Sequence, residues 1–219
     1  MRGRFRLTVL LLLLGAVSVA WYKRDAPKPA GTLRSSVVVG THKEPWENIV
    51  EGAKQQADAA TSYNASYARI AYPNGDVPWA QGACTDVVIR ALRHAGYDLQ
   101  QLIHEDMKRR LSEYPKHGLF PDSNIDHRRV PNQICFFSKY GQTLTNEVSP
   151  ATIKEWRPGD FVYWKAYGRD HTGVISDKMG FSGHPMVIHN LSGCMEADCL
   201  TDWQIVGHYR YPADGSVER

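Results

Sequence analysis

The stretch Gly82-Ala83-Cys84-Thr85-Asp86-Val87-Val88-Ile89-Arg90-Ala91-Leu92 decides the fold, because it places a cysteine where a loop becomes a helix. The apolar residues of this stretch recur at helical spacing as far as Ala95, and so they predict one buried face. Gly96 then supplies a signal for the end of the helix. We therefore expect a helix that begins at Cys84 and packs against the core.

The thiol of Cys84 would lie in the first turn of this helix. Unpaired backbone N–H groups and the positive end of the helix dipole converge there. Both favour a thiolate, and the pKa of a cysteine in such a position can fall from about 8.5 to roughly 3.5–7.5. The alternative is that Cys84 is a small buried hydrophobic residue, which is the usual role of a free cysteine. Position alone leaves both interpretations open.

The first half of the chain predicts further helices. Apolar spacing predicts one over residues 46–63 and another over residues 130–140. Asp98 is expected to cap a third, with Gln101 as its capping-box partner. In that third helix His104-Glu105-Asp106 falls on the side away from the apolar residues, which is typical of a solvated face.

The second half of the chain predicts strands. Four segments separated by turn signals have strand patterns, and their short connections favour antiparallel pairing. Helices followed by strands indicate an α+β domain. The four predicted strands are Asp160 to Lys165, His171 to Asp177, Met186 to Asn190 and Gln204 to Tyr211.

Two of these strands carry histidines that can serve a cysteine nucleophile, which needs a base and a group that orients the base. His171 opens one strand and shares a face with Gly173, which we expect to leave open space beside the imidazole. On the next strand His189 and Asn190 point to opposite faces, so at most one of them can hold His171. Both faces are apolar, and the pattern does not choose between them.

These segments together resemble NlpC-type cell-wall cysteine peptidases. The resemblance implies a compact papain-like fold with N-terminal helices packed on a C-terminal antiparallel sheet, and hydrolysis of amide bonds in peptidoglycan stem peptides. It also implies that Cys84 is the nucleophile, His171 the base and His189 the third polar residue. The matching segments are Gly82-Ala83-Cys84-Thr85-Asp86, Pro158-Gly159-Asp160-Phe161-Val162-Tyr163-Trp164, His171-Thr172-Gly173-Val174-Ile175 and Val187-Ile188-His189-Asn190.

Residues 46–211 resemble more closely the YijF-like bacterial family, whose domain has no known function. This likeness is carried by Cys84 to Ala91, His104-Glu105-Asp106-Met107, Asp122 to Pro131 and Gly207-His208-Tyr209-Arg210.

The substrate contacts are the part in which the chain departs from the NlpC-type pattern. That pattern has aspartate before the cysteine and serine after it, whereas Ala83 and Thr85 stand here and Asp86 follows. Residues 114–133 form a long polar loop, and loops of this length are often functional, for example as the lining of a binding cleft. A surface network of hydrogen bonds within the protein is the alternative. We therefore expect substrate contacts from Asp86 and from three residues of the loop, namely Asp126, His127 and Arg128.

The N-terminus predicts export. Arg2, Arg4 and Arg6 precede an uncharged apolar run that ends at Ser18-Val19-Ala20, a small-x-small cleavage pattern. We expect a signal peptide over residues 1–20, a linker over 21–44, a hydrolase domain over 45–212 and a tail over 213–219. The protein would be periplasmic and have no stable membrane insertion after cleavage. An uncleaved signal would instead anchor it in the membrane.

Charge argues against nucleic acid as a partner. The formal net charge is +3, but residues 1–20 hold three of the 26 basic residues and no acidic one. Removing them leaves 23 basic residues against 23 acidic ones, and no clustered basic face remains.

Four cysteines follow the signal, and an oxidising compartment permits disulfides between them. Cys135 is expected to be buried, and Cys194 and Cys199 are close enough in sequence for a local bridge. A disulfide at Cys84 would exclude catalysis. A structural zinc site is an alternative role for residues spaced five apart, which are His184, His189, Cys194 and Cys199.

The sequence therefore favours an exported cysteine amidase or peptidase whose substrate is peptidoglycan or a peptide, without a metal or organic cofactor. A non-catalytic module that binds the cell wall or a partner on the same fold is the main alternative. The bond cleaved, the choice between hydrolysis and acyl transfer, and the oligomeric state are left open.

Overall fold

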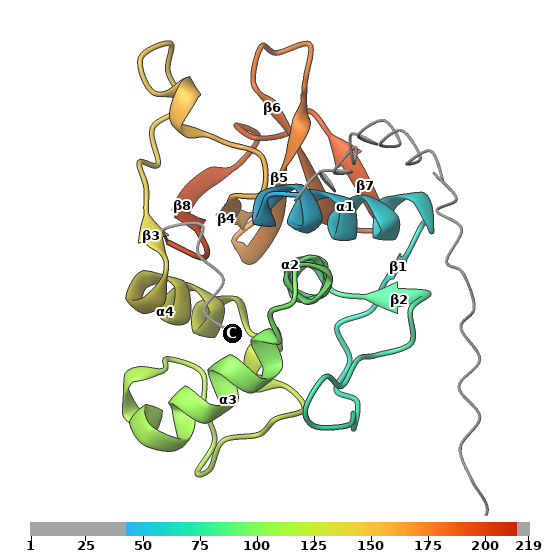
Figure 1. Cartoon of the computed structure of the whole chain (residues 1–219), viewed down its shortest axis with the longest axis vertical. Coiled ribbons are helices and arrows are strands. Elements are labelled where there is room, and N and C mark those ends of the chain that lie inside the picture. The colour runs from blue at the N-terminus through green and yellow to red at the C-terminus, as the bar shows by residue number, and fades with distance from the viewer. Residues whose placement is uncertain (1–42, 214–219) are drawn as a thin grey trace, which may run out of the picture. The chain divides into compact units, whose positions relative to one another are not determined.

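A computed structural model describes residues 43–213, in which four α-helices accompany a six-stranded antiparallel sheet (Figure 1). The α+β expectation is confirmed at this level. The expected signal peptide lies outside the described residues, as do nearly all of the expected linker and tail. Among residues 43–213, no helix is both long enough and apolar enough to cross a membrane.

The helices agree with the apolar patterns, apart from the end of the first one. The second and fourth begin and end where the sequence predicts, and Asp98 caps the third by accepting a hydrogen bond from the backbone N–H of Gln100. Gln101 does not complete the expected capping box. The first ends early because Ala60 adopts a left-handed conformation, with φ of 48°. The bounds are α1 Pro45–Asp58, α2 Cys84–His94, α3 Leu99–Arg110 and α4 Val130–Tyr140, with short 3-10 turns η1 Leu111–Glu113, η2 Asp126–Arg128 and η3 Ile153–Glu155.

The main sheet has the strand order β3-β8-β4-β5-β6-β7. The four predicted strands form its centre, and two short strands that the sequence does not predict extend its edges. A separate two-stranded parallel ladder, β1 with β2, lies just before α2. The bounds are β1 Ser62–Tyr63, β2 Gln81–Gly82, β3 Gln142–Thr143, β4 Phe161–Ala166, β5 Arg169–Met179, β6 Pro185–Asn190, β7 Cys194–Ala197 and β8 Gln204–Arg210.

Two hydrophobic cores lie on opposite faces of the sheet. The helical core contains the buried residues of the four helices together with alternate strand residues such as Tyr163 and Val174. The second core contains the intervening strand residues, such as Trp164 and Ile175, and buried loop residues such as Leu200. This alternation follows from the two-residue period of a strand. Cys84 belongs to the helical core.

The four cysteines are free thiols, so the expected bridge between Cys194 and Cys199 is not formed. The reason is their location: Cys194 packs in the helical core and Cys199 in the second core. Cys135 is half-buried rather than buried, and its thiol donates to the backbone carbonyl of Glu113.

Two other findings concern polar residues, and the first corrects an expectation. Asp106 is buried rather than solvated, because Arg110, Tyr114 and Tyr140 all donate hydrogen bonds to its carboxylate. The polar loop over residues 114–133 contains the buried turn η2, so it is in part an ordered element.

Candidate active site

Cys84 is the first residue of α2, and its side chain is 5% exposed. Three backbone N–H groups near its sulfur lower the pKa of the thiol, those of Thr172 in β5 and of Thr85 and Cys84 at the start of the helix. These groups favour the thiolate, as the sequence predicts. Burial is the larger effect, however, and raises the pKa of the thiol to about 12. The expectation of a lowered pKa is therefore wrong for this closed state.

The two histidines on the sheet are in direct contact. The Nε2 atom of His171 lies 2.9 Å from the Nδ1 atom of His189, and both side chains are 3% exposed. His189 is opposite Gly173 in the β5–β6 register, so its side chain is next to that of His171. Of the two candidates that the sequence leaves open, His189 is the one that holds His171.

Asn190 has a different task on the other face of β6. Its Nδ2 atom donates to the backbone carbonyl of Gly82 at 2.9 Å and to that of Thr61 at 3.2 Å. Asn190 thereby holds the segment that leads into Cys84. Consecutive residues of β6 thus fix the histidine pair and the start of α2.

The same division of roles occurs in β5, where His171 and Thr172 are consecutive. The backbone N–H that lowers the pKa of the Cys84 thiol belongs to the peptide group that joins these two residues. The thiol packs in the helical core, whereas both histidines lie beside Trp164 of the second core. The thiol and the histidine pair therefore lie on opposite faces of the sheet, and the expected contact between Cys84 and His171 is not formed. The imidazole of His171 stacks on Trp164 on one face of the sheet, whereas Val174 packs with α2 in the helical core on the other face. The sulfur of Cys84 is therefore near the backbone of Thr172 in β5, and not near the imidazole of His171.

Gly173 does not leave the open space that the sequence suggests. A Cβ atom there would lie 2.7 Å from Val187 Cγ1 and 3.1 Å from His189 Cβ. The space beside the imidazole of His171 is filled by the neighbouring strand. The glycine is needed because it lets His189 approach His171.

Aromatic rings enclose the histidine pair. The ring of Trp164 stacks on His171 with centroids 5.7 Å apart, and Trp203 contacts both imidazoles edge-on at 5.6 Å and 5.9 Å. Burial among these rings lowers the pKa of His171 to about 4 and also lowers the pKa of His189. Both imidazoles are therefore neutral near pH 7.

Among the residues that the structure describes, the Nδ1 atom of His171 has no hydrogen-bond partner. It is the nitrogen left to exchange a proton. Asp202 is close enough to His189 for its charge to raise the pKa of that imidazole, opposing the effect of burial. Asp202 and Trp203 are not among the site residues expected from the sequence. The only sequence feature that could have indicated them is their position directly before the last strand.

The loop residues expected to bind substrate make contacts within the protein. Asp86 and Arg128 form a buried ion pair in which Nε and Nη2 of the guanidinium each lie 2.8 Å from a carboxylate oxygen. Arg128 also donates to the backbone carbonyl of Ser66. Asp126 accepts from the backbone N–H of Asp122, and burial raises the pKa of its carboxyl. These contacts connect the loop to the first turn of α2.

His127 is the loop residue whose side chain has an unused polar atom. It is 2% exposed, and its Nδ1 atom has no hydrogen-bond partner among the described residues. Burial lowers the pKa of this imidazole to about 3, so the ring is neutral. A role of these loop residues in substrate binding stays a prediction.

The alternative zinc ligands do not come together. His189 contacts His171, and Cys194 and Cys199 lie in different cores. In residues 43–213 there is no group of three or more histidine, cysteine or acidic side chains arranged to hold a metal ion.

Comparisons with known proteins identify relatives but no chemistry. Residues 50–211 match the family described as "Domain of unknown function (DUF1287)". The chain is 46% identical over 167 residues to "Uncharacterized protein YijF" of Escherichia coli (strain K12), which covers 74% of this chain and 80% of that protein. No solved structure matches the chain.

Proposed function

Because the chain belongs to the DUF1287 family, whose function is unknown, we propose from its own side chains that it is an exported cysteine amidase or peptidase. Its substrate would be an amide bond in a peptidoglycan stem peptide, and its fold would be papain-like. The proposal is supported by two neighbouring features of β5, one at the side chain of His171 and one at the backbone N–H of Thr172. The imidazole of His171 contacts His189, and the next N–H, that of Thr172, lowers the pKa of the Cys84 thiol.

His189 would act by selecting the tautomer of His171. Two neutral imidazoles in contact share one proton, so one ring donates and the other accepts. When Nε2–H of His171 donates to Nδ1 of His189, the Nδ1 atom of His171 is a free base. The opposite arrangement would place a proton on Nδ1 and leave His171 unable to accept another.

In this structure the thiol of Cys84 and the imidazole of His171 lie on opposite faces of the sheet, so the proposed first step requires a rearrangement that brings them together. The thiol proton of Cys84 then moves to Nδ1 of His171 and the sulfur attacks the carbonyl carbon. The N–H groups at the start of α2 would hold the developing oxyanion, an effect worth about 2.7–4 kcal/mol for each donor. His171 then returns the proton to the nitrogen as the C–N bond breaks, and the amine leaves. Water, deprotonated by the same nitrogen, releases the acid from the thioester. The resting thiol and imidazole are neutral, so the proton moves only during the reaction.

Mass spectrometry of purified muropeptides tests the proposal directly. The wild-type protein is expected to cleave one amide bond, and Cys84→Ala is expected to leave the fragments intact. Cys135→Ala is a matched control, because its thiol is half-buried and belongs to α4. Cleavage at an undiminished rate by Cys84→Ala would refute the assignment of the nucleophile.

A binding module is the second candidate, and the closed site favours it. The three central side chains are each at most 5% exposed, and the thiol is protonated at neutral pH. A module of this kind would bind muropeptides with equal affinity in the wild type and in His171→Gln, and would cleave neither. An enzyme would bind them in both and cleave them only in the wild type.

A further inference from the structure

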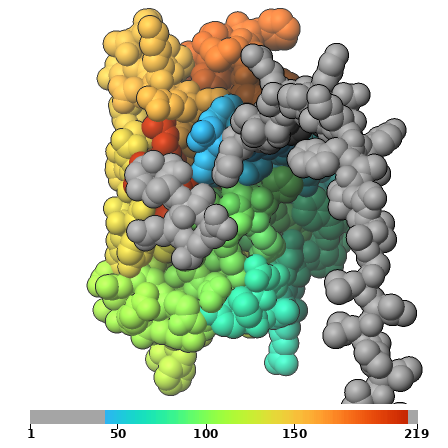
Figure 2. Space-filling model, in the orientation of Figure 1, coloured from blue at the N-terminus to red at the C-terminus, as the bar shows by residue number. Residues whose placement is uncertain are grey.

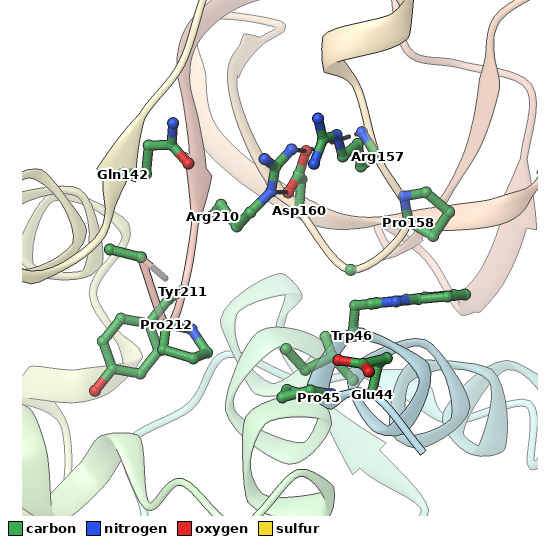
Figure 3. Close-up of a pocket in the computed structure, with 13 residues that line it drawn as sticks. Glu44, Pro45, Trp46, Gln142, Arg157, Pro158, Asp160, Arg210, Tyr211 and Pro212 are labelled. Atoms are coloured by element: carbon green, nitrogen blue, oxygen red, sulfur yellow. Dashed lines mark hydrogen bonds and ion pairs between the residues drawn. The ribbon is translucent and has the colours of Figure 1, made fainter. Parts of the chain in front are cut away.

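A second pocket lies apart from the residues of the candidate active site. It has a volume of about 620 Å³ and is formed by the start of α1, the turn before β4 and the end of β8 (Figure 3). Figure 2 shows that the start of α1 (blue) and the end of β8 (red) both reach the surface on one face. Small-molecule pockets commonly enclose about 300–1,000 Å³, so this volume is suited to a small ligand. Neither Cys84 nor the two histidines line it.

One side of this pocket is a flat apolar surface. Trp46 is 41% exposed there although its ring is large and hydrophobic. Pro45, Pro158 and Pro212 add further apolar surface around it. Gly159 has φ of 85°, and a Cβ atom at this position would lie 2.9 Å from Trp46 Cβ. The turn therefore packs closely on the backbone and Cβ of Trp46, which fixes the point from which the exposed ring projects.

The pocket also carries charge, and two of its charged side chains, Arg157 and Glu44, have no ion-pair partner among the described residues. Asp160 accepts from Arg210 at 2.7 Å and 2.9 Å, so these two neutralise each other. Glu44 lies beside Trp46 at the start of α1, where the helix dipole favours a negative charge. The guanidinium of Arg157 is exposed and forms no hydrogen bond or ion pair with any residue of the described part. In Figure 3 Arg157, Asp160 and Arg210 lie across the pocket from Trp46.

We propose that this pocket binds a sugar ring that carries a carboxylate group. An exposed indole face suits the apolar face of a sugar ring, because aromatic side chains combine a large apolar area with a fixed shape. A free guanidinium suits a carboxylate, which it binds through two parallel hydrogen bonds. The pocket offers both at once on opposite sides. This binding is separate from hydrolysis at Cys84 and does not require it.

Nuclear magnetic resonance of the tryptophan indole N–H groups tests the proposal, with the Trp46 signal assigned by Trp46→Phe. Three probes separate the two features: N-acetylmuramic acid has ring and carboxylate, N-acetylglucosamine has the ring alone, and D-lactate has the carboxylate alone. N-acetylmuramic acid is expected to shift the Trp46 signal saturably, and the other two probes to bind at least tenfold more weakly.

Arg157→Gln is the variant that tests the carboxylate contact, and it is expected to weaken binding of N-acetylmuramic acid at least tenfold. Arg109→Gln is the matched control, since Arg109 has a side chain 64% exposed on α3 and does not line the pocket. Absence of a saturable shift would overturn the proposal. Equal binding of N-acetylglucosamine, or unchanged binding in Arg157→Gln, would overturn it as well. None of these results depends on whether Cys84 is a nucleophile.

Discussion

The Nε2 atom of His171 lies 2.9 Å from the Nδ1 atom of His189, across two adjacent strands of the sheet. The next residue of each strand faces the start of α2: the backbone N–H of Thr172 lowers the pKa of the Cys84 thiol, and Asn190 donates to the carbonyl of Gly82. The histidine pair and the thiol are thus positioned by the same two strands. The predictions below follow from this arrangement.

His189 is predicted to control the proton position on His171. Replacing it by phenylalanine removes the acceptor, so muropeptide turnover is expected to fall about 100-fold or more. Glutamine keeps an acceptor oxygen and is expected to retain part of the activity. Long-range ¹⁵N–¹H spectra should locate the His171 proton on Nε2 in the wild type. A wild-type proton on Nδ1 would contradict the proposed role, and His117→Gln, an exposed histidine, is the control.

The reactivity of Cys84 is predicted to rise steadily with pH. Burial raises the pKa of this thiol to about 12, so the thiolate fraction grows about tenfold for each pH unit below that value. Alkylation by iodoacetamide, followed on the Cys84 peptide by mass spectrometry, should therefore accelerate from pH 6 to pH 9 without a plateau. A rate that is already at its maximum below pH 7 would mean that a thiolate is present in the free protein.

Gly173→Ala is predicted to disturb the histidine pair. The added methyl group would lie 2.7 Å from Val187 Cγ1 and 2.9 Å from the Ile188 carbonyl oxygen, so the strands must shift. Overpacking of this kind costs about 1–3 kcal/mol of unfolding free energy. Gly193→Ala is the control, because a Cβ atom there meets nothing within 4 Å. Equal unfolding midpoints in urea for the two variants would contradict the packing argument.

The ion pair of Asp86 and Arg128 is predicted to stabilise the start of α2. Arg128→Gln leaves the Asp86 carboxylate buried without its partner, which costs about 3–5 kcal/mol of unfolding free energy. Arg129→Gln changes the exposed neighbour and should have little effect. Urea denaturation of both variants measures the difference. If Arg128→Gln were as stable as Arg129→Gln, the loop would not hold the helix in the way described.

The sequence predicts well those elements whose pattern is local. Residues 84–94 and 130–140 have clear helical spacing, and the four central strands lie between strong turn signals. The edge strands β3 and β7 were missed because they are only two and four residues long. Segments so short show no period of their own, and their pairing depends on neighbours far along the chain.

The sequence identifies candidate site residues, but it does not predict how their side chains are placed or how burial changes their pKa values. His189 and Asn190 have the same local pattern, and only the register between β5 and β6 shows which of them reaches His171. The pKa of Cys84 is set by burial from several elements, which outweighs the helix dipole visible in the sequence. Asp106 is another such case, since its partners Tyr114 and Tyr140 come from outside its helix.

The most direct measurement of the central claim is the mass of the protein itself during turnover. Purified muropeptides are mixed with the protein, the reaction is stopped with acid, and the Cys84 peptide is analysed by mass spectrometry. We predict an acyl group bound through a thioester to Cys84 in the wild type and no adduct in His171→Gln. Product formation without any acyl group on Cys84 would contradict the claim that this thiol, served by His171, is the nucleophile.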